Sequence, residues 1–551
     1  MDDLFSHHLE ESYILNSTVE HRKKYAQFFT PYKVAQFMTA WVMGGSREIQ
    51  SILDPAVGLG VFIRAIQEHL NSFSLTSPAL SQIKIKGYEL DPQILAIAQQ
   101  QLKQLDYPEN IELLGLDYLF HDWEFSYDAI ICNPPYFKFQ DFKTKNRALR
   151  EFSDRLSINL TGFTNIYALF LLKSLHQLKE EGRGAYIVPS EFLNADYGKA
   201  VKTHLLKYKF LRYIIIFNSQ ESLFDRALTT SCILLFSPDY ESPTVEFINI
   251  MSLQDLDHLG QKLKLYPDQP LNNKIAYNSL NPNIKWRAYY QETHTHKYQN
   301  LIDFSAYAKV SRGIATGAND YFLFTKEKAQ ALQISEQYLL PVISKANQVT
   351  NSFFKEGDFQ KLAMENKPIY LLNAHAVQDK DLSIKKYIIR GENLGIHQKY
   401  LTSRRNPWYA IEQRLPAPIW VSVFSRGGLR FIRNEAGVRN LTTFHCVYLN
   451  SGGLEKIDLL FAYLLTDVAK NIFADHRREY GGGLEKFEPN DLNHAKVINL
   501  DCISEAESLE ILYYYERHKK ESAESSREKN QNSKLLNHLN EIFMMLLKKD
   551  N

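Results

Sequence analysis

Four consecutive residues, Asn133-Pro134-Pro135-Tyr136, carry the groups in this sequence that are best suited to chemistry. Proline fixes the backbone and has no N–H, so this turn offers carbonyl oxygens without competing donors. Asn133 adds an amide oxygen, and Tyr136 adds a flat ring with a polar end. Two acceptors beside an aromatic face suit a planar group bearing an –NH2, such as adenine. The alternative is that Asn-Pro is only a turn former.

The residues before this turn predict a buried strand that ends at it. The run 127–132 is short and apolar, contains β-branched residues and is closed by the prolines. A second predicted strand, 51–54, is followed by Gly58 and Gly60 and then by a helix from Val61. Strand, glycine turn and helix form a nucleotide-binding arrangement at the carboxyl edge of a parallel sheet. A plain turn is the alternative for the glycine pair alone.

Acids stand at the ends of three successive predicted strands. Asp54 ends the first, and Glu89 and Asp117 lie at the ends of strands expected over 83–91 and 111–118. Asp54 would repel a pyrophosphate and suits a cationic or zwitterionic ligand, whereas Glu89 stands where a carboxylate takes both ribose hydroxyls. Taken alone, a surface carboxylate is usually only solvated. Taken together with the Asn-Pro-Pro-Tyr turn, they predict one polar edge of one sheet.

An N-terminal segment, 27–31, precedes these strands with the sequence Gln-Phe-Phe-Thr-Pro. Thr30 and Pro31 predict a helix start, with the threonine as N-cap and the proline in the first helical position. The helix would place Val34, Phe37, Met38 and Trp41 on one face. Without the motifs that follow, this segment is simply a cap helix.

In this order the motifs resemble the gamma-class N6-adenine DNA methyltransferases, which are TaqI-like enzymes of restriction–modification systems. That family runs from Gln-Phe-Phe-Thr-Pro through Asp-Pro-Ala-x-Gly-x-Gly, a ribose acid and an adenine-side Asp to Asn-Pro-Pro-Tyr. Every element is present here, within residues 1–240. Val57 and Leu59 replace the usual small residues of the glycine loop, which changes the fit around a methionine group but removes no functional group.

The resemblance implies an α/β fold: a Rossmann-like S-adenosylmethionine-dependent methyltransferase domain, a mixed α+β target-recognition domain and C-terminal helices. It implies S-adenosyl-L-methionine as methyl donor and assigns catalysis to Asn133, Pro134, Pro135 and Tyr136. Glu89 would hold the donor's ribose, Asp117 its adenine amine and Thr30 its methionine end. The implied donor contacts are Gln27, Phe28, Thr30, Asp54, Pro55, Ala56, Gly58, Gly60, Glu89, Leu90, Asp117, Tyr118 and Pro135. No metal site is expected.

Aromatic residues and cations alternate after the turn, over 137–147, which suits a loop along a DNA backbone beside an extruded base. A solvated basic loop is the alternative. The resemblance implies that Phe224 and Tyr136 stack on the two faces of the flipped base, although an isolated Phe is usually a core residue.

Arginines recur from Arg312 onward among Asn and aromatic residues, in a chain whose formal net charge is only +1. Arginine is favoured for phosphate forks and guanine edges, so this composition predicts one local face for double-stranded DNA. Some of these arginines will be ordinary surface residues. The cations expected at DNA are Lys138, Lys143, Lys145, Arg147, Arg312, Arg404, Arg405, Arg426 and Arg430.

Length and composition predict several domains in a soluble protein. The 551 residues are divided here into a methyltransferase domain (1–240), a polar connecting region (241–300), a target-recognition domain (301–502) and a C-terminal helical segment (503–551). The four cysteines form no C-x-x-C, which favours a reducing compartment. No leader or membrane span is visible, so a cytoplasmic location without membrane contact is expected.

Direct methyl transfer needs no covalent intermediate, so Cys132 receives no role, unlike the thiol in cytosine-C5 methylation. Three other functions remain open: methylation of RNA, methylation of a protein glutamine, and a non-catalytic DNA-specificity subunit. A cognate restriction endonuclease would be a separate partner, because no segment long enough to hold a fused nuclease is visible before Lys23.

Overall fold

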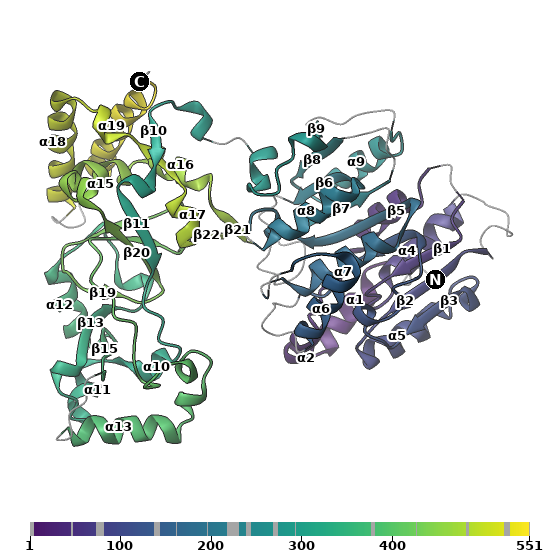
Figure 1. Cartoon of the computed structure of the whole chain (residues 1–551), viewed down its shortest axis with the longest axis horizontal. Coiled ribbons are helices and arrows are strands. Elements are labelled where there is room, and N and C mark those ends of the chain that lie inside the picture. Colours follow the sequence, from purple (N-terminus) through teal and green to yellow (C-terminus); the bar gives the residue numbers. More distant parts are fainter. Residues whose placement is uncertain are drawn as a thin grey trace. The chain divides into compact units, whose positions relative to one another are not determined.

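The chain forms two compact units in the computed structural model (Figure 1). One comprises Met1–Glu292 with Glu479–Gly483, and the other comprises Thr293–Arg478 with Leu484–Asn551. The residues described are 5–45, 48–72, 82–136, 144–160, 162, 164–195, 197–217, 231–238, 244–267, 274–291, 294–375, 381–425, 427–480, 484–522 and 529–549.

The first unit is built on a sheet that has nine strands in the described part of the chain, in the order β3-β2-β1-β4-β5-β7-β6-β8-β9. Neighbouring strands from β3 to β5 are parallel, whereas β7 runs antiparallel to both β5 and β6. The strands are β1 (Ser51–Asp54), β2 (Lys84–Tyr88), β3 (Ile111–Leu114), β4 (Tyr127–Cys132), β5 (Leu178–Pro189), β6 (Leu211–Phe217), β7 (Ser231–Phe236), β8 (Thr244–Ile250) and β9 (Lys274–Ala276).

Helices cover both faces of this sheet. Successive strand residues point to opposite faces, and Ile130 accordingly belongs to one core cluster while Ile131 belongs to the other. The cluster with Ile130 includes α6 (Lys145–Leu156), α7 (Ile166–Gln177) and α8 (Gly198–Tyr208). The cluster with Ile131 includes α3 (Tyr32–Val42), α4 (Val61–Ser72), α5 (Pro92–Leu102) and α9 (Asp255–Leu263). The predicted α/β class is confirmed.

The polar region 241–300, expected to connect two domains, lies largely in the first unit. Its residues 244–250 form β8, which pairs in parallel with β6, and 274–276 form β9 on the outer side of β8. Val245 and Phe247 of β8 are buried in the core. All but one of the Asn, Asp and Pro residues that suggested a linker lie outside β8 and β9, so the sheet extends further along the chain than composition indicated.

The N-terminal helices α1 (His8–Asn16) and α2 (Val19–Tyr25) precede α3, and α1 is anchored to α4 by an ion pair inside the protein. Glu10 and Arg64 are both fully buried, and Arg64 donates hydrogen bonds to the Glu10 carboxylate and to the Ser6 carbonyl oxygen. Burial raises the pKa of Glu10 to about 7, although the Arg64 charge opposes the shift. The pair therefore fixes α1 through an interaction that requires both partners.

The second unit is a mixed α+β body with several small sheets. In the part of the chain that the structure describes, their orders are β11-β20-β16-β18-β14, β12-β15-β13-β19 and β10-β23, and β17 pairs with β22. The strands are β10 (Leu301–Asp303), β11 (Ala308–Arg312), β12 (Leu323–Phe324), β13 (Leu339–Ile343), β14 (Phe353–Phe354), β15 (Tyr370–Leu372), β16 (Ile419–Ser422), β17 (Phe424–Ser425), β18 (Phe431–Asn434), β19 (Arg439–Asn440), β20 (Phe444–Leu449), β22 (Leu484–Lys486) and β23 (Lys496–Ile498). Most of the short strand β21 (Arg478–Tyr480) belongs to the first unit.

The last two helices, α18 (Glu505–Glu521) and α19 (Lys529–Leu546), pack into this second unit. Their apolar side chains, among them Tyr515 and Phe543, join one buried cluster with α15 (Ile457–Leu465). The C-terminal helical segment is therefore part of the second unit's core. The other helices are α10 (Asn319–Phe322), α11 (Lys326–Ala331), α12 (Glu356–Met364), α13 (Leu382–Asn393), α14 (Ser451–Glu455), α16 (Asp467–Ala474) and α17 (Pro489–Asn493).

Replacing Arg64 by Ala tests the buried ion pair. The substitution leaves Glu10 buried without its cation, so the free energy of unfolding should fall by about 3–5 kcal/mol, measured by urea denaturation. Arg155→Ala is the control, because Arg155 pairs with Glu124 and Glu151 at the surface and should change stability by about 0–1 kcal/mol. Equal losses in the two variants would contradict the role of the buried pair.

Candidate active site

The polar edge expected from the sequence exists at the carboxyl ends of four adjacent parallel strands. Asp54 ends β1, Glu89 follows β2, Asn133 follows β4, and Asp117 lies beyond β3. These ends border a cavity of ≈ 440 Å³. Glu89, Asp117 and Asn133 line the cavity directly, whereas Asp54 lies buried beside it.

Most residues predicted to contact the methyl donor line this one cavity. Asp54 and Gly60 do not reach its surface; Pro134 lines it, and Tyr136 lies outside the lining. The lining members of the predicted donor set are Gln27, Phe28, Thr30, Pro55, Ala56, Gly58, Glu89, Leu90, Asp117, Tyr118 and Pro135.

Several other residues line the cavity although no sequence motif predicted that they would. Phe62 of α4 and Ile166 and Phe170 of α7 supply apolar surface to the cavity, and Lys24 lines it from α2. In the sequence these residues look like ordinary members of helices, and only packing shows that they face a ligand-sized space.

The glycine loop between β1 and α4 requires the backbone that glycine permits. Gly58 and Gly60 have φ angles of +57° and +83°, which side-chain-bearing residues adopt rarely. A Cβ on Gly60 would also lie 3.1 Å from a methyl carbon of Leu102. The loop can therefore turn tightly between strand and helix and present Gly58 to the cavity.

Two of the strand-end acids hold this loop in place. Glu89 accepts hydrogen bonds from the backbone N–H groups of Gly58 (3.0 Å) and Asp91 (2.8 Å). Asp54 Oδ1 accepts from the Ala56 N–H at 3.1 Å, and its Oδ2 is buried without a hydrogen-bond partner among the described residues. Burial raises the pKa of Asp54 to about 8. A cationic ligand beside it would favour the ionised form.

Asn133 is oriented by hydrogen bonds from its amide nitrogen. Nδ2 donates to the Phe28 carbonyl oxygen at 2.7 Å and to Thr30 Oγ1 at 3.0 Å. A flipped amide would place Oδ1 against the Phe28 carbonyl, which cannot donate, so this orientation is determined by the contacts. Oδ1 is buried and has no partner within the described chain. Asn133 lines the cavity, and its Oδ1 is an acceptor that no described residue uses.

The predicted role of Thr30 as a helix N-cap is wrong. Helix α3 begins at Tyr32, and its N-cap, Pro31, has no side-chain capping bond. The Thr30 hydroxyl is buried and accepts from Asn133 instead. Two segments separated by about a hundred residues therefore meet through this hydroxyl, a contact that local sequence patterns do not encode.

Tyr136 is held beside the turn in a fixed position. Its hydroxyl donates to the Ile187 carbonyl oxygen at 3.1 Å, and its ring stacks on Phe28 with centroids 5.4 Å apart and an interplanar angle of 24°. Phe224, its expected stacking partner across a flipped base, lies outside the described residues. Cys132 is buried, and burial raises the pKa of its thiol well above the usual value, which disfavours a reactive thiolate.

The cations predicted at DNA have different surroundings. Lys138 and Lys143 lie outside the described residues; Lys145 begins α6, and exposed Arg147 places its guanidinium 4.0 Å from the Phe120 ring centroid. In the second unit, Arg312 and Arg404 are exposed, and Arg404 lies over the Tyr400 ring. Arg405 and Arg430 donate to backbone carbonyls of Ala315, Thr316 and Val349, and Arg426 lies outside the described residues.

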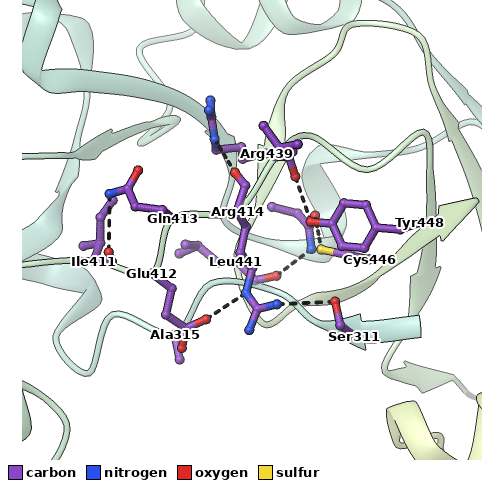
Figure 2. Close-up of polar contacts among 12 residues, drawn as sticks. Ser311, Ala315, Ile411, Glu412, Gln413, Arg414, Arg439, Leu441, Cys446 and Tyr448 are labelled. Carbon is purple, nitrogen blue, oxygen red and sulfur yellow. Dashed lines mark hydrogen bonds and ion pairs between the residues drawn. The ribbon is translucent and has the colours of Figure 1, made fainter. Parts of the chain in front are cut away.

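Two further arginines, Arg414 and Arg439, make polar contacts near Ser311, the residue that precedes Arg312 in β11 (Figure 2). Arg414 Nη1 donates to Ser311 Oγ at 3.3 Å, and its Nε donates to Glu412 at 2.8 Å. Arg439 Nε donates to the Arg414 carbonyl oxygen at 2.7 Å. The Arg414–Ser311 hydrogen bond therefore ties the segment 411–414 to the end of β11, next to the exposed Arg312.

The sheet order, the glycine loop and the strand-end acids define an S-adenosylmethionine-dependent methyltransferase. Residues 59–224 match the Eco57I restriction-modification methylase family, and residues 285–538 match the C-terminal domain of Type II methyltransferase M.Eco57I. Type II methyltransferase M.AccI of Acinetobacter calcoaceticus is 48% identical over 94% of this chain and 93% of its own length. The chain belongs to the Type II methyltransferases of restriction–modification systems, and it is a DNA methyltransferase.

A more distant relative and two solved structures extend the likeness. Type II methyltransferase M.XamI of Xanthomonas campestris pv. amaranthicola is 22% identical over 86% of this chain and 85% of its own length. A DrdV–DNA complex has a TM-score of 0.53 at 11% identity, over 90% of this chain and 57% of that chain. A nuclease-deletion mutant of the Type ISP enzyme LlaGI, with a DNA substrate mimic, has a TM-score of 0.51 at 14% identity, over 82% and 52%. These structures share the fold.

The described residues lack two kinds of structural feature. None of the helices there is long and apolar enough to cross a membrane. The same residues contain no group of three or more His, Cys, Asp and Glu side chains that could hold a metal ion.

Asp54→Asn should alter how stability depends on pH. The pKa of Asp54 rises from 3.8 to about 8 on folding, so its contribution to stability is complete below pH 3.8 and declines as pH rises to about 8. Asn retains an oxygen for the Ala56 N–H and does not titrate. Between pH 5 and pH 8 the melting temperature of the wild type should therefore fall more steeply than that of the variant. Parallel melting curves would contradict the assignment.

Proposed function

We propose that this enzyme transfers a methyl group from S-adenosylmethionine to N6 of an adenine flipped out of double-stranded DNA. The observation that carries the proposal is the buried Oδ1 of Asn133, which has no hydrogen-bond partner among the described residues, while Phe28 and Thr30 hold the amide nitrogen. The acceptor adjoins a proline turn whose residues Pro134 and Pro135 also line the cavity. We call Asn133, Pro134 and Pro135 the corner. An exocyclic –NH2 has two hydrogens to donate to the acceptor oxygens of this corner.

The corner acts on the nucleophile. The N6 lone pair of adenine is delocalised into the ring, so the amine attacks poorly by itself. Asn133 Oδ1 and the Pro134 carbonyl oxygen would accept its two hydrogens, which concentrates electron density on nitrogen and directs it toward the donor methyl. Positioning and electrostatics then supply the rate, without a covalent intermediate. Tyr136, with its hydroxyl held by Ile187, would stack on the base, opposite Phe224.

The residues of the cavity fit the donor. When bound, S-adenosylmethionine supplies an activated methyl on a sulfonium cation, and Asp54, whose Oδ2 has no partner in the described part of the chain, favours positive charge nearby. Glu89 would hold the ribose hydroxyls, because each carboxylate oxygen keeps a second lone pair after accepting from the backbone. Asp117 would accept from the donor's adenine amine, and Thr30 would contact the methionine end.

Asn133→Ala should lower kcat by about 10²–10³-fold, because it removes an acceptor that acts in the transition state. Labelled donor and duplex DNA measure transfer, and mass spectrometry of nucleosides identifies N6-methyladenine as product. Donor affinity by calorimetry is the control and should change little. Undiminished transfer by the variant, or wild-type transfer to RNA or to a protein glutamine in place of DNA, would overturn the proposal.

We also propose that the exposed cations contact DNA phosphates or base edges, together with Lys138, Lys143, Lys145, Arg147 and Arg426. Arg312 and Arg404 are exposed, whereas the guanidinium groups of Arg405 and Arg430 already donate to backbone carbonyls. The role of the latter two at DNA remains a prediction, and each also stabilises the second unit.

Arg312→Ala and Arg404→Ala should each weaken duplex binding and reduce the slope of log K against log salt by about 1, measured by fluorescence anisotropy. Arg405→Ala is the comparison and should lower the melting temperature as well. A salt slope unchanged by both exposed-site variants would contradict this DNA face.

A cognate restriction endonuclease, acting as a separate protein in the cytoplasm, would complete the system. The family supports this proposal, since Type II methyltransferases belong to restriction–modification systems.

A further inference from the structure

The N-terminal segment 19–30, termed the strap, comprises α2 and the extended residues that follow it. Its Ala26 has φ = +49°, a left-handed conformation that costs free energy for a residue with a side chain and persists where the surroundings enforce it. The next residues, Gln27 to Thr30, line the cavity. The strap is therefore a strained turn followed by a cavity wall.

One buried carboxylate, that of Asp91, binds two side chains of the strap. Asp91 is fully buried and is the N-cap of α5, where Oδ1 accepts from the Gln93 N–H at 3.0 Å. Its Oδ2 accepts from Gln27 Nε2 at 2.6 Å and lies 2.7 Å from His21 Nε2. The helix cap thus uses one oxygen, and the other oxygen binds two strap side chains, one on each side of the Ala26 turn.

The far end of the strap orients the proposed acceptor. Within four residues of Gln27, the Phe28 carbonyl and the Thr30 hydroxyl accept both hydrogen bonds from Asn133 Nδ2. A carboxylate accepts and does not donate when ionised, so Gln27 must present its NH2 to Asp91. Gln27 therefore donates to Asp91, and Asn133 donates to the strap at the Phe28 carbonyl oxygen and the Thr30 hydroxyl.

We propose that Asp91 is a positioning residue for methyl transfer. By holding Gln27 and His21 it fixes the strap, and the strap fixes the Asn133 amide with its oxygen toward the substrate amine. This inference rests on the proposed function, which makes Asn133 Oδ1 an acceptor for the substrate amine. The same strap forms a wall of the donor cavity, so donor binding and alignment of the acceptor depend on one carboxylate.

Asp91→Ser separates the strap from the helix cap. Serine retains an N-cap oxygen for the Gln93 N–H, but its side chain is too short to reach Gln27 and His21. At saturating donor, kcat should fall about 10- to 100-fold, as expected for a misaligned reacting group, and donor affinity should weaken in calorimetry. Hydrogen exchange of the strap amides should increase while the melting temperature changes little.

The matched control is Asp255→Ser, the same substitution at the start of α9. Asp255 accepts from the Met251 and Ser252 N–H groups and touches no strap residue in the contacts described. It should leave kcat and donor affinity unchanged. Wild-type kcat in Asp91→Ser, or equal kinetic losses in both variants, would overturn the inference.

Exchanging the carboxylate and the amide between positions 27 and 91 tests whether the contact itself is needed for kcat. Gln27→Glu alone sets a second carboxylate against Asp91, and kcat should fall. Adding Asp91→Asn restores a donor–acceptor pair with reversed direction, and kcat should recover at least in part. Failure of the double variant to exceed Gln27→Glu alone would also overturn the inference. Full activity of Asn133→Ala would remove the proposed acceptor, whereas wild-type kcat in Asp91→Ser together with loss of activity in Asn133→Ala would overturn only the positioning role, so the two failures are distinguishable.

Discussion

The site depends on the orientation of one side-chain amide. Asn133 follows the end of a central strand, where the backbone is fixed by the sheet and by two prolines. Its rotation is then fixed by two acceptors from an N-terminal segment that belongs to no strand of the sheet. An amide pinned on its nitrogen side has only its oxygen left for a ligand. Because that oxygen is buried, a hydrogen bond to it is stronger than it would be in water.

Two acids at the cavity, Glu89 and Asp54, interact with the glycine loop in different ways. One oxygen of the Glu89 carboxylate accepts a hydrogen bond from the Gly58 N–H, and this contact keeps the glycine loop close to β2. Asp54 is so deeply buried that its neutral form is favoured in the free protein, and a cationic donor would reverse that preference. Under the proposed function, donor binding would be coupled to deprotonation of Asp54, whereas Asn133, Pro134 and Pro135 carry no ionisable side chain and would act by geometry.

Local patterns were sufficient for the first four strands and their order along the chain, because a short apolar run closed by glycine, acid or proline has few other conformations. They failed where a residue's partner lies far away in sequence. Thr30 had the sequence of an N-cap but accepts from Asn133, and residues 244–276 read as a linker but add β8 and β9 to the sheet. Arg405 resembled a free DNA contact, yet it donates to the backbone of its own unit.

The sequence by itself determined the order of motifs and therefore which functional groups stand at one edge of the sheet, since parallel strands align their carboxyl ends. Tertiary structure alone decided how those groups are arranged: which Asn133 atom lacks a partner among the described residues, which acids line the cavity, and that Asp91 binds the strap. The physical reason is that hydrogen-bond direction and burial are set by contacts between distant segments. Periodicity and spacing report only the conformation of neighbours along the chain.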